Sequence, residues 1–103
     1  MKLAWVYVTF PTRKIAHKIV DQLLAERRIA CANLFPIEAR YHWKRKIEKG
    51  TEVAALLKAR ASTFRALSAR INELHPYDVP CVLKIDLDDA LPAFARYVAA
   101  ETR

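Results

Sequence analysis

The first quarter of the chain predicts a strand followed by a helix. Leu3–Phe10 is apolar, is rich in β-branched and aromatic side chains and is stopped by Pro11, which is typical of a strand. Thr12 is placed to cap a helix, because its hydroxyl can accept a hydrogen bond from an amide of the first turn. The apolar side chains that follow recur at helical spacing and predict one buried stripe: Ile15, Ala16, Ile19, Val20, Leu23 and Leu24.

The middle of the chain predicts a long hairpin. One strand is expected over Cys31–Pro36 and, after an irregular region at that proline, over Arg40–Ile47. Thr51–Ala61 reads as the returning strand. The only glycine, Gly50, lies beside Lys49 between the two runs. Because a tight hairpin turn favours a positive φ, this pair is the predicted tip.

The C-terminal half predicts a helix, a strand and a short last helix. Ser62 is expected to cap the first of these, whose apolar face consists of Phe64, Leu67, Ile71 and Leu74. The prolines of His75–Pro80 must end that helix. Cys81–Asp88 alternates apolar and polar side chains, as a half-buried strand does. Asp88–Asp89 and Pro92 are expected to open the last helix, which carries Leu91, Phe94 and Val98.

This order of elements, βαββαβα, predicts the fold class. It is an α+β, ferredoxin-like βαββαβ two-layer sandwich with an extended hairpin and an appended C-terminal helix. A chain of 103 residues has the length of one domain, so residues 1–103 are expected to form a single domain.

The predicted central strands are apolar on both faces. In the first strand Trp5 and Tyr7 alternate with Val6 and Val8, and residues 53–57 of the third strand repeat this pattern. An exposed apolar face of several hundred Å² is rare on a monomer and usually marks an interface. We therefore expect self-association. The alternative is that the appended helix covers the face within one chain.

Composition and charge narrow the function classes. The chain carries 18 Lys+Arg against 11 Asp+Glu, a net charge of +7, which favours either contact with polyanions or simple solubility. It has no apolar run of the ~18–20 residues that a membrane-spanning helix needs. Its two cysteines do not form a disulfide framework, and the N-terminus does not resemble a signal peptide. We therefore expect a cytoplasmic protein with no membrane partner.

Metal binding and catalysis receive weak support from residue spacing. Local clusters such as Cys-x2-Cys or His-x3-His are absent, because the ligand-type residues are scattered: His17, Cys31, His42, His75 and Cys81. Cys31 and Cys81 are expected at the starts of strands on opposite edges of the sheet, so within one subunit we expect them to act as small hydrophobic side chains. At the interface of an oligomer they could instead meet and bind a metal or form a redox pair. The chain has neither a Gly-rich phosphate loop nor a G-x-S-x-G motif. We therefore expect no enzymatic activity.

Nucleic-acid binding is the competing function class, because RNA-recognition domains share this topology. The tract Arg40–Lys46 interleaves aromatic and cationic side chains, as single-strand binders do. However, the third strand, Glu52–Lys58, has none of the aromatic side chains that RNA-recognition domains stack on bases. A solvated hairpin arm with an aromatic anchor explains the tract better, so a nucleic-acid partner is not expected.

Several segments taken together resemble the CutA family of divalent-cation tolerance proteins. They have the order and spacing of that family from Trp5 to about Tyr97: Tyr7–Pro11, Ala30–Pro36, Tyr41–Trp43 with Lys46–Glu48, Glu52–Lys58 and His75–Pro80. The resemblance implies a tight homotrimer, similar in architecture to PII signalling proteins. It also implies a cytoplasmic location, a link to tolerance of copper and other divalent cations, and no established reaction.

The resemblance also implies a ligand cleft at the subunit interfaces. The family's recurrent cleft positions correspond to Cys31, Trp43, Glu52, Lys58, His75, Pro76, Tyr77 and Pro80. Lys58 could neutralise an anionic ligand or pair with Glu52, with which it shares a strand face. Trp43 is expected to anchor the hairpin on a neighbouring subunit.

The chain departs from the family at proposed copper ligands. Val8 and Leu74 stand where a cysteine and a first histidine are proposed, and only His75 remains of the three. Cys81 replaces the usual glutamate after Val-Pro, and Arg45 replaces the glycine of the hairpin turn. If copper or another divalent cation is bound, the expected ligands are His75, Cys31 and Cys81 at an intersubunit edge.

Overall fold

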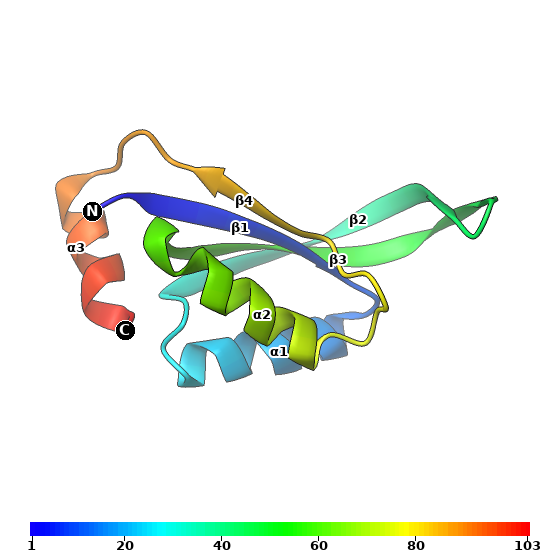
Figure 1. The fold of residues 1–103 in the computed structure, drawn as a ribbon, viewed down its shortest axis with the longest axis horizontal. Coiled ribbons are helices and arrows are strands. Elements are labelled where there is room, and N and C mark those ends of the chain that lie inside the picture. Colours follow the sequence, from blue (N-terminus) through cyan, green and yellow to red (C-terminus); the bar gives the residue numbers. More distant parts are fainter.

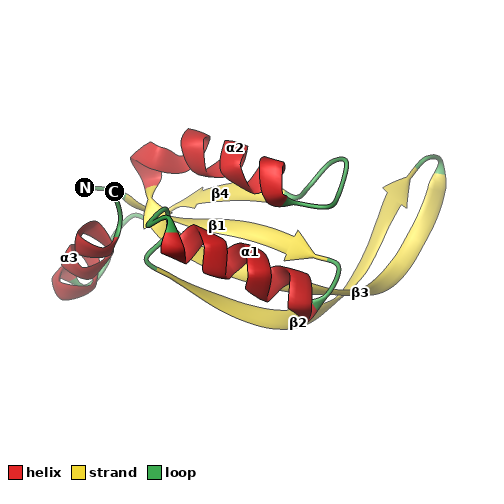
Figure 2. Ribbon diagram, turned by 90° about the horizontal axis from the view of Figure 1, so that it is seen from below, coloured by secondary structure: helices red, strands yellow, loops and turns green.

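One antiparallel sheet organises the chain, as described for all residues 1–103 by a computed structural model. Its strand order is β2-β3-β1-β4. The strands are β1 (Leu3–Phe10), β2 (Cys31–Trp43), β3 (Lys46–Arg60) and β4 (Val82–Asp86). The helices are α1 (Arg13–Ala25), α2 (Phe64–Leu74) and α3 (Pro92–Glu101), with a 3-10 turn at Ala61–Thr63. This confirms the predicted α+β sandwich, with α1 and α2 on one face of the sheet and α3 at one end (Figures 1 and 2).

The main core lies between the sheet and the two covering helices. On β1 the side chains of Val6, Val8 and Phe10 are fully buried and belong to the same cluster as Leu57 of β3. The predicted stripe of α1 is buried at Ala16, Ile19, Val20 and Leu23. The hydroxyl of Thr12 accepts a hydrogen bond from the Ile15 amide at 3.2 Å, which confirms the predicted cap. Leu24, at the edge of the stripe, is exposed.

The β2–β3 hairpin extends past the sheet as an arm, residues 37–52, and its tip differs from the prediction (Figure 1). The turn is formed by Lys44 and Arg45, which both have positive φ, as a two-residue type I′ turn requires. Gly50 instead lies inside β3, opposite Ala39, without a positive φ. The pairing register of the two strands, rather than the position of the glycine, therefore sets the turn.

Other element ends also differ from the sequence prediction. β2 runs unbroken through Pro36, because it is an edge strand, where a missing N–H is tolerated. Ser62 does not cap α2, because the chain enters that helix through the 3-10 turn. α3 begins at Pro92 with Leu91 as its N-cap, and Asp89 accepts a hydrogen bond from the adjacent Ala90 amide instead. β4 is shorter than the predicted Cys81–Asp88.

The second face of the sheet remains largely open. Trp5 lies opposite Ile85, and Tyr7 lies opposite Leu83, so these four side chains share the face that α1 and α2 do not cover. Trp5, Leu83 and Ile85 are 38%, 56% and 47% exposed. α3 covers only one end of this face, where its Val98 packs with Leu3 and Ala30. The appended helix therefore does not cover the apolar face, contrary to the alternative considered from the sequence.

None of the helices has the length and apolar character needed to cross a membrane.

Candidate functional site

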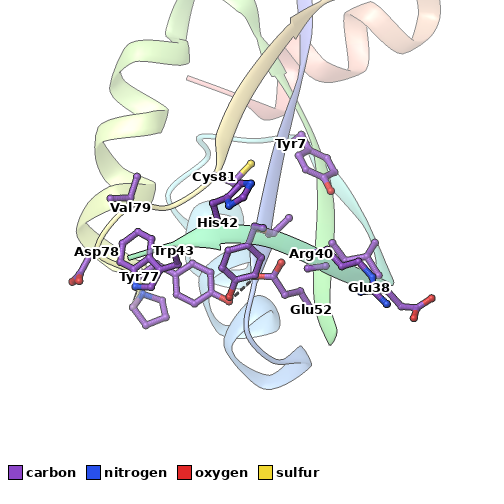
Figure 3. A pocket seen from close by; sticks show the side chains of 15 residues that line it. Tyr7, Glu38, Arg40, His42, Trp43, Glu52, Tyr77, Asp78, Val79 and Cys81 are labelled. Carbon is purple, nitrogen blue, oxygen red and sulfur yellow. Dashed lines mark hydrogen bonds between the residues drawn. The ribbon is translucent and has the colours of Figure 1, made fainter. Parts of the chain in front are cut away.

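An open cleft of about 830 Å³ lies between the arm and the loop that joins α2 to β4. The arm curves on the side of this loop, which brings strand residues 37–43 near loop residues 76–79 (Figures 2 and 3). Tyr7 and Thr9 of β1, Glu52 of β3 and Cys81 complete the lining. The cleft therefore combines the middle of the sheet, the base of the arm and the loop.

His75 holds the start of the loop against β1. It is 7% exposed, and its ring stacks on Phe10 with a centroid separation of 5.2 Å. Its Nε2–H donates to the carbonyl of Thr9 at 2.7 Å, and its Nδ1 accepts from the amide of Tyr77 at 3.2 Å. Burial lowers the pKa of His75, while the Thr9 carbonyl and the Glu52 charge partly oppose this shift. The ring is therefore a neutral brace between β1 and the loop.

Tyr77 and Glu52 join the loop to the arm. The Tyr77 hydroxyl donates to Oε2 of Glu52 at 2.6 Å (Figure 3). Burial raises the pKa of Tyr77, and the hydrogen bond to Glu52 raises it further. The Glu52 charge also contributes to the raised pKa values of Tyr7 and Cys81, for which burial is the larger cause. Glu52 therefore supplies the negative charge in the middle of the cleft.

The predicted metal ligands do not come together within one chain. Cys31 begins β2 opposite Lys58, whereas Cys81 directly precedes β4, so the two thiols lie at opposite edges and opposite ends of the sheet. Both ring nitrogens of His75 already have hydrogen-bond partners. No group of three His, Cys, Asp or Glu side chains in the chain could hold a metal ion. A metal does not fit this set of residues in a single subunit.

The other predicted cleft residues divide into two groups. Trp43, Glu52, Pro76 and Tyr77 line the cleft, and Pro80 directly precedes its Cys81. Lys58 lies away from them and donates to the side-chain carbonyl of Asn33. The hypothesised pair of Lys58 with Glu52 does not form, because six strand residues span about 20 Å even when both side chains share a face.

Two tyrosines of the cleft were not singled out as site residues from the sequence. Tyr7 and Tyr41 both line it, one from β1 and the other from the arm. Tyr41 could have been found from the sequence, because it lies two residues before Trp43 and therefore on the same face of the strand. Tyr7 and Tyr41 line the same cleft because the arm curves (Figure 2).

Comparison with known proteins places this geometry in a family. The family model described as CutA1 divalent ion tolerance protein matches residues 4–101. The divalent-cation tolerance protein CutA of Pyrococcus horikoshii is 48% identical over 98 residues, which cover 95% of this chain and 96% of that protein.

Solved structures agree with this match. A crystal structure of CutA1 from Pyrococcus horikoshii has a TM-score of 0.94 at 47% identity, covering 97% of this chain and 98% of that chain. The structure of an Archaeoglobus fulgidus protein, described as a periplasmic divalent cation tolerance protein CutA, has a TM-score of 0.94 at 30% identity, with 96% and 97% coverage. The chain therefore belongs to the CutA1 divalent ion tolerance protein family.

Proposed function

We propose that the protein is a non-enzymatic, cytoplasmic homotrimer that acts in divalent-cation tolerance by binding a metal ion or small ligand at its subunit interfaces. The open apolar face of the sheet carries this proposal. Trp5, Leu83 and Ile85 form a contiguous apolar surface that no element of the chain covers. A surface of this kind is stabilised by association with further copies.

The cleft supplies the ligand site in this proposal. It is concave, it has a volume in the range of small-molecule sites, about 300–1,000 Å³, and it is lined by aromatic rings around a few polar groups. The arm that forms one wall extends beyond the body of the subunit (Figure 1). A neighbouring copy that packs on the arm through Trp43 would close the cleft, which is why we assign the ligand to the interface.

Copper is the metal to test, with ligands drawn from different subunits. Cys31 and Cys81 are both free and half-buried, and thiolates suit Cu(I). Their positions at opposite sheet edges allow a Cys31 of one subunit to approach Cys81 of the next. His75 could join them only by giving up the hydrogen bond that its Nδ1 accepts from Tyr77.

Native mass spectrometry of the reduced protein, with and without equimolar Cu(I), tests both the trimer and the interfacial copper site. A species of three times 11.8 kDa is expected, and a monomer would refute the assembly. Saturable copper adducts on the trimer are expected for an interfacial metal site. Titration of His75→Ala with Cu(I) then tests that ligand, since an unchanged affinity would remove His75 from the site. Affinity for single-stranded nucleic acid that falls steeply with salt would favour the competing function instead.

A further inference from the structure

The charge of the cleft is opposite to the charge of the chain. The chain as a whole has a net charge of +7. The residues that line the cleft include three carboxylates and one guanidinium, namely Glu38, Glu52, Asp78 and Arg40. Of the three carboxylates, only that of Glu52 lies among the aromatic rings, whereas those of Glu38 and Asp78 point outward at the rim (Figure 3). Arg40 forms no ion pair, so it does not neutralise these carboxylates by direct contact. A ligand recognised here by charge is therefore a cation rather than an anion.

The walls of the cleft are aromatic. Tyr7, Tyr41, Trp43 and Tyr77 contribute rings to the lining from three separate segments: β1, the arm and the loop. The face of an aromatic ring attracts a cation within about 6 Å of its centre, and it also accommodates methylene groups. Such walls favour an organic cation, since a small metal ion gains its affinity from several charged or carbonyl oxygens instead.

Glu52 provides a directional acceptor within these walls. Its Oε2 accepts the Tyr77 hydroxyl at 2.6 Å, and no hydrogen bond of the chain engages its Oε1. The Glu52 charge is felt at three neighbours, because it contributes to the raised pKa values of Tyr77, Tyr7 and Cys81. One oxygen of a carboxylate that is already oriented by a tyrosine is thus left for an N–H donor.

We propose that the cleft binds an organic ammonium ion of the polyamine class, with an ammonium group donating to Glu52 and the methylene chain lying on the aromatic rings. The proposal rests on the cleft used in the proposed function and names the class of its ligand. The volume of about 830 Å³ accommodates a linear polyamine. Glu38 and Asp78 are exposed residues at the rim of the cleft, and their carboxylates point outward (Figure 3).

Titration of the full chain with spermidine, followed by amide resonances in two-dimensional NMR at fixed ionic strength, tests the proposal. Saturable shifts are expected at Tyr7, Glu52 and Tyr77. Glu52→Gln keeps the side-chain shape and an acceptor for Tyr77 but removes the charge. It is expected to weaken spermidine binding about tenfold or more, since a hydrogen bond to a charged group contributes about 1.5–3 kcal/mol.

Glu48→Gln is the matched control, because it makes the same charge change on the same strand. Glu48 is exposed, forms no ion pair and does not line the cleft, so the spermidine affinity of this variant is expected to stay within about twofold. Trp43→Leu removes a ring and is expected to weaken binding about threefold to tenfold. Equal losses in the two glutamate variants would indicate unspecific attraction and would overturn the proposal.

Two further outcomes separate this proposal from the assembly. If Mg²⁺ or Cu(I) displaces spermidine at a lower concentration than spermidine itself requires, the cleft is a metal site and the polyamine proposal fails. Native mass spectrometry of the same samples reports the oligomer independently. A trimer that does not bind spermidine overturns only this inference, whereas a monomer that binds it through Glu52 overturns only the trimer.

Discussion

Leu83→Asp is expected to dissociate the proposed trimer into monomers. Leu83 lies opposite Tyr7 on the open sheet face and is 56% exposed in the single chain. Full burial of a leucine side chain contributes about 1.5–3 kcal/mol, so covering the exposed half contributes about 1 kcal/mol per subunit. The substitution removes this contribution in three subunits, about 3 kcal/mol, and also buries a carboxylate against Trp5 and Ile85.

Analytical ultracentrifugation of the parent and the variant at equal micromolar concentration measures this effect. A loss of about 3 kcal/mol alone lowers the association constant by roughly two orders of magnitude. Leu91→Asp is the control, because Leu91 is 72% exposed at the N-cap of α3, away from the sheet face, and aspartate is favoured at that position. If Leu83→Asp sediments as a trimer like the control, the open face is not the interface.

Three further predictions concern stability, measured by urea denaturation at one protein concentration. Leu67→Ala, at a side chain 1% exposed between α2 and the sheet, is expected to lower the free energy of unfolding by about 2–5 kcal/mol, and a loss below about 1 kcal/mol would contradict the assigned core. The pKa of His75 is lowered in the folded protein, so its contribution to the free energy of unfolding is complete above pH ~6.5 and declines as the pH falls below that value. His75→Gln is expected to remove this decline of the free energy of unfolding with falling pH. An unchanged decline in the variant would exclude His75 as its source. Glu26 accepts hydrogen bonds from Arg70 and has a strongly lowered pKa, so its contribution to the free energy of unfolding is present above pH ~4.5 and lost in stronger acid. Glu26→Gln is expected to reduce the loss of stability below pH ~4.5. An unchanged loss would argue against this hydrogen-bonded pair as its source.

The order and type of the elements followed from local patterns. The apolar alternation of β1, the cap at Thr12 and the helical stripes of α1 and α2 are properties of neighbouring residues, and the structure confirms them. The topology followed from their order, because short connections allow few arrangements of this kind. The apolar character of both faces of β1 was also visible in the sequence, whereas the structure showed that α3 leaves one of them open.

The turn of the arm could not be located from local preference. Gly50 is the residue best suited to a positive φ, yet the turn lies five residues earlier, at Arg45. Thirteen residue pairs of β2 and β3 are in register from Cys31–Lys58 to Trp43–Lys46. The summed pairing of the two strands outweighs the local strain of two non-glycine residues with positive φ. The pairing register of β2 and β3 therefore fixes the position of the turn, and the residue types near the turn do not.

The residues of the candidate site were only partly predictable from the sequence. The resemblance in sequence indicated Glu52, Tyr77, Trp43 and Pro76, and these residues line one cleft. It also indicated Lys58, which the rise of a strand carries away from Glu52 by about 20 Å.

The sequence by itself thus determined the identity of the elements, the residues of the core and the apolar character of both faces of β1, because each depends on side chains that are close along the chain. The tertiary structure decided that α3 leaves one face of the sheet open, and it decided how the site is assembled. The curvature of the arm brings Tyr41 and Trp43 to the loop, and the Tyr77 hydroxyl meets Glu52 across 25 positions of sequence. It also decided that His75 is a brace, because both of its ring nitrogens bond to backbone groups, one of them on a strand 66 positions away. Contacts at such separations depend on how strands twist and loops fold back, which no local pattern of residues records.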